Sequence, residues 1–223
     1  MKLGLKIALL GVILFFSDCK KKDKDPVGEP APTPVPNPPQ TIDINHRTIV
    51  QFDADNKTYS YQFNDVSDTI RWDFGFNTEL ATSMSGTSTA EYSHYFYNYN
   101  TGSIFFKVDI GTIFTKGIVG RPDTAALRLF FATGPVIYST AYTPDHLNGV
   151  VIKHKDGNGV MWASNKGSSD QTGSSFNIVS NRQVPSLPDE MKIYATFNCK
   201  VYDDNGNSKD LTNGKLVVSF ANR

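Results

Sequence analysis

The 223-residue chain has little cysteine, no net charge and no long hydrophobic run. Cys19 and Cys199 are its two cysteines, which excludes a disulfide-stapled scaffold. Basic and acidic side chains each number 22, and this balance argues against a nucleic acid partner, which requires a basic surface. The apolar run Leu9–Phe16 is too short to cross about 30 Å of hydrocarbon as a helix.

Residues 1–18 have the layout of a secretory signal. Lys2 and Lys6 precede the apolar run, and Cys19 follows it. The segment resembles a lipoprotein signal peptide, which is cleaved just before a cysteine that carries the lipid, although Asp18 stands where that family usually has Gly, Ala or Ser. The resemblance implies a lipoprotein held at the membrane by palmitate or a related acyl chain on Cys19. An uncleaved apolar anchor, or a signal cut elsewhere, is the alternative.

Residues 19–40 are predicted to be a lipid-anchored, proline-rich linker. Seven prolines between Pro26 and Pro39 remove backbone donors and favour extended polyproline II. At ~3.1 Å per residue, Pro26 to Gln40 would reach about 45 Å. A spacer is favoured over a ligand for a proline-binding module. The lysines that follow Cys19 would lie at the lipid headgroups.

Residues 41–223 remain as one domain, long enough to bury a core. Without the residues before Thr41, 16 basic and 18 acidic side chains are left, so the domain itself has no electrostatic attraction to anionic lipid. The signal and the linker together indicate the cell envelope, with the outer membrane favoured over the inner. In lipoproteins of the kind this signal resembles, surface display favours acidic residues just after the lipidated cysteine, whereas Lys20–Asp25 mix both charges. The periplasmic face is therefore favoured over the cell surface.

Apolar and polar residues alternate with period two through most of this domain. The alternation is clear at Tyr59–Phe63, Ile70–Phe76, Phe106–Ile110, Val150–Ile152, Phe176–Ile178, Ile193–Val201 and Leu216–Phe220. This pattern is typical of antiparallel strands with one buried face. Turns are expected at Asp156–Gly159, at Asp203–Asn207, and at Asn213-Gly214, which is expected to lead into the last strand.

The sequence therefore predicts an all-β fold, a single antiparallel β-sandwich with one short helix. The helix is expected over Asp123–Phe131, after Pro122 and before Gly134, with Asp123 as its cap. The side chains expected to face inwards are Trp72, Phe74, Phe106, Ile152, Phe176, Phe197, Val201 and Val218.

No metal or cofactor site is predicted. His46, His94, His146 and His154 form no pair on a helix of the kind that zinc proteases use, and four separate surface or rim histidines are expected. The segment Asp203–Asp210 is rich in oxygen ligands, so a calcium site is an alternative. Its glycine lies at the fourth position rather than the sixth, and no glutamate closes the loop, which favours a hairpin turn.

Catalytic patterns are also lacking. Cys199 shares parity with Phe197 and Val201, which predicts a buried and inert thiol. No Gly-x-Ser-x-Gly elbow is present, and the pairs Asp53/Asp55 and Asp65/Asp68 are expected in turns. A non-enzymatic binding or structural module is favoured. The alternative is a polysaccharide-acting hydrolase with acids recruited from distant loops.

One segment suggests a binding surface. Tyr95, Tyr97 and Tyr99 share parity, and Phe96 points the other way. If Phe96 is in the core, the tyrosines form an outward row that suits stacking against sugar rings. The expected partner is then a glycan, or else an envelope protein. The opposite interpretation, in which the tyrosine face is itself core, remains open, and Trp162 is equally ambiguous.

Strand and turn motifs in the second half of the domain carry a family resemblance. They are Leu129-Phe130-Phe131 with Gly134, Asn148–Ile152, Asp156–Ser164, Gly173–Ile178, Ala195–Cys199, Tyr202–Gly206 and Leu211–Leu216. In these motifs the chain resembles an uncharacterised class of small Bacteroidetes-type lipoproteins with a C-terminal β-sandwich, over about Phe105 to Phe220. The resemblance implies an envelope location and a β-sandwich, and it assigns no catalytic or binding residue.

Overall fold

The computed structural model describes residues 42–62, 70–79, 87–115, 123–140 and 147–221. These residues contain eleven β-strands and one α-helix. All of them belong to one compact unit, Thr41–Arg223. The predicted signal peptide and linker lie outside the described residues. The elements are β1 (Ile49–Ala54), β2 (Lys57–Gln62), β3 (Ile70–Glu79), β4 (Thr87–Asn98), β5 (Ile104–Thr115), α1 (Thr124–Phe130), β6 (Gly134–Val136), β7 (Gly149–Lys155), β8 (Met161–Ala163), β9 (Ser175–Val184), β10 (Leu187–Tyr202) and β11 (Ser208–Ala221).

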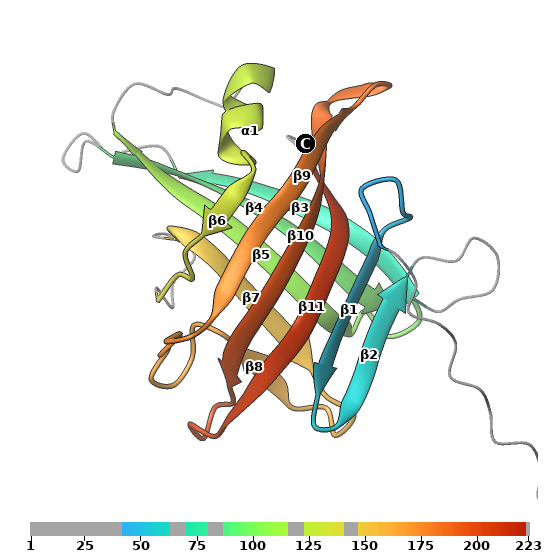
Figure 1. Ribbon diagram of the computed structural model, residues 1–223, viewed down its shortest axis with the longest axis vertical. Helices are drawn as coiled ribbons and strands as arrows, with labels where there is room; N and C mark the ends of the chain where they lie inside the picture. The colour runs from blue at the N-terminus through green and yellow to red at the C-terminus, as the bar shows by residue number, and fades with distance from the viewer. Residues whose placement is uncertain (1–41, 63–69, 80–86, 116–122, 141–146, 222–223) are drawn as a thin grey trace, which may run out of the picture. The chain divides into compact units, whose positions relative to one another are not determined.

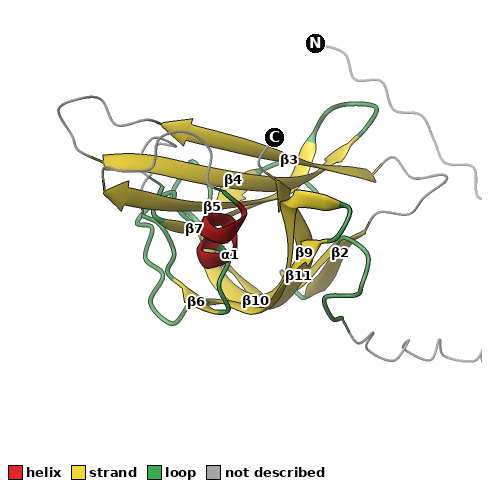
Figure 2. Ribbon diagram, turned by 90° about the horizontal axis from the view of Figure 1, so that it is seen from above, coloured by secondary structure: helices red, strands yellow, loops and turns green. Residues whose placement is uncertain are grey.

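The strands form one continuous sheet in the order β2-β1-β11-β10-β8-β7-β5-β4-β3, with β9 paired to β10 and β6 paired to β9. Every pairing between these strands is antiparallel. The short strand β8 pairs with both β10 and β7. The sheet folds over so that β3, β4, β5 and β7 face β1, β2, β9, β10 and β11, and the strands of the two layers cross (Figures 1 and 2). The predicted antiparallel β-sandwich is confirmed.

The core lies between the two layers and is rich in aromatic rings. Phe52 of β1 lies 5.7 Å from Phe106 of β5 and 6.2 Å from Phe197 of β10, measured between ring centroids. The predicted inward residues that are fully buried are Phe106, Ile152, Phe176, Phe197, Val201 and Val218. Trp72 is partly buried against the same core, and the side chain of Phe74 lies outside the described residues.

The helix predicted near Pro122 is present as α1, at one end of the sandwich, over the opening between the two layers (Figures 1 and 2). The Asp123 carboxylate accepts a hydrogen bond from the Ala126 N–H at 2.8 Å, which caps the first turn as expected. At the other end, Phe131 is fully buried and stacks on Phe220 of β11, with centroids 4.7 Å apart. No helix in the described part of the chain is long and apolar enough to span a membrane.

The structure corrects the prediction for Asn213-Gly214. These residues do not form a turn before the last strand, because β11 runs through them. Leu211 pairs with Cys199 and Gly214 pairs with Phe197, which leaves Thr212 and Asn213 opposite the single residue Asn198. Asn213 takes a positive φ of 53°. The Asn-Gly pair therefore makes a bulge, which needs the same left-handed backbone as a tight hairpin.

A second, smaller hydrophobic cluster lies on the outer face of the layer that contains β1, β10 and β11. Ile42, Ile49 and Val217 are buried there, and Tyr194 of β10 packs against them. The Lys192 ammonium donates to the His46 carbonyl at 2.6 Å, which fixes the segment before β1 over this face.

Candidate functional site

The outer face of β4 carries two of the three predicted tyrosines. Phe96 is fully buried in the core, so the residues on either side of it, Tyr95 and Tyr97, lie on the opposite face of the strand, where both are partly exposed. Their ring centroids are 5.9 Å apart. The structure thus places this pair on the outward face, and its role in binding stays a prediction.

Tyr99 lies just beyond the end of β4 and is 66% exposed. The Asn98 side chain accepts hydrogen bonds from the backbone N–H groups of Asn100 and Thr101, at 2.9 and 3.1 Å, and so shapes this turn. The Arg71 guanidinium lies 5.6 Å from the centre of the Tyr99 ring. Arg71 also pairs with Tyr97 in the β3–β4 register, so the third tyrosine is held beside the other two. We call Tyr95, Tyr97 and Tyr99 the tyrosine surface.

Charged side chains continue the face across the neighbouring strands. Tyr95 pairs with Asp73 of β3 on one side and with Lys107 of β5 on the other. Lys107 in turn pairs with Lys153 of β7. Burial, together with the charge and hydrogen bond of Asp73, raises the pKa of Tyr95. Its phenol is therefore neutral at physiological pH.

Lys107 and Lys153 converge on one buried carboxylate. Their ammonium nitrogens lie 2.8 and 3.2 Å from Oδ1 and Oδ2 of Asp109. The Ser93 hydroxyl donates to Asp109 Oδ1 at 2.6 Å. Asp109 is 2% exposed. Its buried carboxylate therefore holds both lysine ammonium groups close to the sheet, on the face that carries Tyr95.

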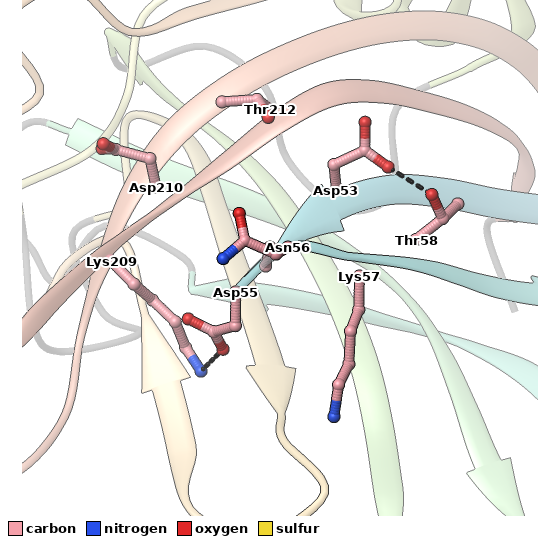
Figure 3. Close-up of a pocket in the computed structure, with 9 residues that line it drawn as sticks. Asp53, Asp55, Asn56, Lys57, Thr58, Lys209, Asp210 and Thr212 are labelled. Atoms are coloured by element: carbon pink, nitrogen blue, oxygen red, sulfur yellow. Dashed lines mark hydrogen bonds and ion pairs between the residues drawn. The ribbon is translucent and has the colours of Figure 1, made fainter.

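A polar groove of about 650 Å³ lies on the layer opposite β4, between the β1–β2 hairpin and β11 (Figure 3). Asp53, Asp55 and Asp210 all line it. Asp53 is in strand β1 rather than in the expected turn, and it accepts hydrogen bonds from Thr58 and Asn213, which lower its pKa. A general acid for glycoside cleavage needs a raised pKa instead. Asp53 therefore does not suit the role of that general acid.

Trp162 is fixed by a network next to this groove. The Lys209 ammonium lies 4.0 Å from the centre of the indole ring and 2.9 Å from the Asp55 carboxylate. The indole N–H donates to Asp156 at 2.8 Å. Burial acts to raise the pKa of Asp156, but the bonds from Trp162 and from backbone N–H groups, with the Lys209 charge, lower it to about 2. Trp162 is thus held in place and partly buried against the core.

Two histidines are buried, contrary to the expectation of four surface histidines. His94 and His154 have no exposed surface, because each faces inwards from its strand with the apolar residues of the same parity. His94 Nδ1 lies 2.8 Å from the Ser219 carbonyl, while its Nε2 has no hydrogen-bond partner among the described residues. Burial lowers the pKa of each to about 4, assisted at His154 by the charge of Lys209. His46 is partly exposed, and His146 lies outside the described residues.

The described residues contain no group of three or more side chains able to hold a metal ion. In the oxygen-rich segment, Asp203 Oδ1 accepts from the backbone N–H groups of Asn205 and Asn207, and Oδ2 accepts from the Asn207 side chain. N–H donors, rather than other oxygens, surround this carboxylate. The geometry is that of the hairpin turn.

Cys199 is buried, as strand parity predicted. Burial raises the pKa of its thiol to about 12. It is therefore a protonated thiol at neutral pH and not a nucleophile.

No protein-family model, no curated protein and no solved structure matches this chain. The fold and the site define an antiparallel β-sandwich with partly exposed tyrosines and paired lysines on one outer face.

Proposed function

We propose that the protein is a cell-envelope lipoprotein, anchored through Cys19, whose β-sandwich is a non-enzymatic module that binds a glycan on its tyrosine surface. One observation carries the binding part of the proposal. Phe96 is buried and points away from Tyr95 and Tyr97, so both tyrosines are partly exposed on the outer face of β4.

Aromatic rings suit sugars because the face of a pyranose ring is apolar, while the tyrosine hydroxyl can hydrogen-bond with the ring substituents. The surface is also partly preorganised. Asp73 holds the Tyr95 hydroxyl, and Arg71 lies over the Tyr99 ring. Side chains that are already held lose less conformational entropy when a ligand binds.

The anchoring part of the proposal is supported by the sequence. A short apolar run ends at Cys19, and the proline-rich spacer after it can lift the domain about 45 Å from the headgroups. The resemblance to small Bacteroidetes-type lipoproteins supports the same location. We propose the outer membrane, with the domain on the periplasmic side.

A polysaccharide hydrolase is the second candidate, and the three carboxylates of the groove are the observation that favours it (Figure 3). The lowered pKa of Asp53 argues against it. A partner lipoprotein in place of a glycan is a further alternative for the tyrosine surface.

The test is a glycan array probed with the full chain in mild detergent, comparing the parent with Tyr97→Ala. Tyr194→Ala is the matched control, because Tyr194 is a partly exposed tyrosine on the outer face of the other layer. We expect Tyr97→Ala to weaken binding about fivefold, the equivalent of ~1 kcal/mol for one stacked ring. Unchanged binding to every hit, or no hit at all, would contradict a glycan module. Release of new reducing ends would favour the hydrolase.

A further inference from the structure

We propose that the ligand of the tyrosine surface is an acidic saccharide, whose carboxylate groups are bound by Lys107 and Lys153. This inference rests on the proposed glycan binding and narrows it to sugars that carry a negative charge. The geometry that carries it is the row formed by Tyr95, Lys107 and Lys153, which we call the cationic row.

The register places the three side chains of the cationic row next to one another. Tyr95 pairs with Lys107 across β4 and β5, and Lys107 pairs with Lys153 across β5 and β7. Adjacent strands are ~4.8 Å apart, so the row extends over roughly 10 Å. A sugar ring that stacks on Tyr95 therefore has ammonium groups beside it on the same face.

The two lysines carry more positive charge than their shared partner can neutralise. Both contact Asp109, one at each carboxylate oxygen, so two ammonium groups share one negative charge. The Asp109 side chain is 3% exposed, whereas those of Lys107 and Lys153 are 23% and 35% exposed. The Asp109 carboxylate is therefore buried beneath the lysines, whereas the ammonium groups that carry the surplus positive charge are accessible to solvent. An ammonium has three N–H donors, and each contact with Asp109 uses one of them.

Other charged side chains on this face lie outside the row. Arg71 and Asp73, with opposite charges, lie on the β3 side of the tyrosines. Glu91 lies on β4 opposite Gly111, two positions along from the Ser93–Asp109 pair. The row itself consists of Tyr95 and two lysines and contains no carboxylate.

A single surplus charge beside stacked rings fits a sugar carboxylate better than a polyanionic surface. Binding to lipid headgroups or to nucleic acid requires a cluster of unneutralised cations. Here the aromatic rings supply contact with the sugar, and the lysines select for its charge. Binding through these charges must also weaken as salt is added, because the lysines are partly exposed.

The test uses uronic acid oligosaccharides and their methyl esters as matched probes, with the full chain in mild detergent. Oligogalacturonate, oligomannuronate and oligoglucuronate are each measured with free and with esterified carboxylates, which changes the charge and leaves the sugar ring unaltered. The variants are Lys153→Gln and Lys153→Arg. The control is Lys215→Gln, which removes the same charge from the outer face of β11 in the opposite layer.

At least one free acid is expected to bind five- to tenfold more tightly than its ester. That preference should be lost in Lys153→Gln and retained in Lys153→Arg and Lys215→Gln. Equal binding of acids and esters would overturn the inference, as would an effect of Lys153→Gln no larger than that of Lys215→Gln, or no binding of any acid. If the esters bind equally well and Tyr97→Ala weakens them, the acidic ligand is wrong and the glycan module stands. If acids bind but Tyr97→Ala has no effect, the tyrosine surface is wrong instead.

Discussion

Gly214 of β11 lies directly against Phe197 of β10. A Cβ atom on Gly214 would come within 2.5 Å of the Phe197 ring and of its carbonyl oxygen. Gly214 pairs with Phe197 directly after the bulge at Thr212 and Asn213, and Phe197 is fully buried in the aromatic core. The contact therefore requires a residue without a side chain.

We expect Gly214→Ala to destabilise the domain by about 2 kcal/mol or more, because the added methyl group must displace a buried ring or the backbone. Gly157→Ala is the control. A Cβ at Gly157 meets nothing within 4 Å, so that variant should change the free energy of unfolding by less than ~0.5 kcal/mol. Urea unfolding of both variants checks the prediction, and equal stability would contradict the packing described.

The buried histidines make stability depend on pH. His94 and His154 have folded-state pKa values of about 4, against ~6.5 in an unfolded chain. Between these values the unfolded chain binds more protons, so stability is complete above about pH 6.5 and falls as pH decreases towards 4. Each histidine contributes on the order of 3 kcal/mol to this loss.

The variant that isolates this effect is His154→Phe, since His154 lies among aromatic rings, 5.0 Å from Phe52 and 4.7 Å from Tyr59. We expect it to fold and to lose roughly half of the decline in stability between pH 6.5 and 4. The measurement is urea unfolding across that range. An unchanged slope would show that His154 is not buried in its neutral form.

The anchor can be tested directly. Cys19→Ser removes the atom to which the lipid is proposed to attach, so the variant should move from the membrane and detergent fraction into the aqueous fraction. The parent chain expressed alongside is the reference for fractionation. Retention of the variant in the membrane fraction would support an uncleaved apolar anchor.

The thiol of Cys199 should be unreactive in the folded protein. It is buried, and its pKa is raised to about 12. A thiol reagent is expected to modify less than a tenth of the chains under native conditions. In denaturant it should modify one cysteine per mature chain, because Cys19 is proposed to be acylated. Two reactive thiols in denaturant would contradict the acylation, and rapid native labelling would contradict the burial.

Parity along the strands predicted more of this fold than any motif did. It placed Cys199 inside correctly, and it showed that Phe96 must face away from Tyr95 and Tyr97 without deciding which of the two faces is buried. The same parity could have placed His154 with Val150 and Ile152, but a polar ring was expected at the surface. The two neutral histidines are buried because each occupies an inward-facing position of its strand. Composition alone does not reveal which positions face inwards.

The cationic row could not be predicted in the same way. Lys107 and Asp109 are outward residues of one strand, but Lys153 comes 44 positions after Asp109 and meets them only through the β5–β7 register. Register depends on which strands become neighbours. The bulge at Asn213 was missed for a related reason, because an Asn-Gly pair predicts a left-handed backbone without saying whether a strand ends or bends there.

The central claim is that Tyr95, Tyr97 and Tyr99 form the glycan-binding surface. Its most direct test is NMR of the tyrosine rings, with the full chain in detergent micelles titrated with the strongest saccharide from the array. Ring labelling reports on all ten tyrosines of the chain at once. The account predicts saturable shifts at Tyr95, Tyr97 and Tyr99, while the buried Tyr92 and the distant Tyr194 stay unchanged. Shifts at other tyrosines, with these three unaffected, would contradict it.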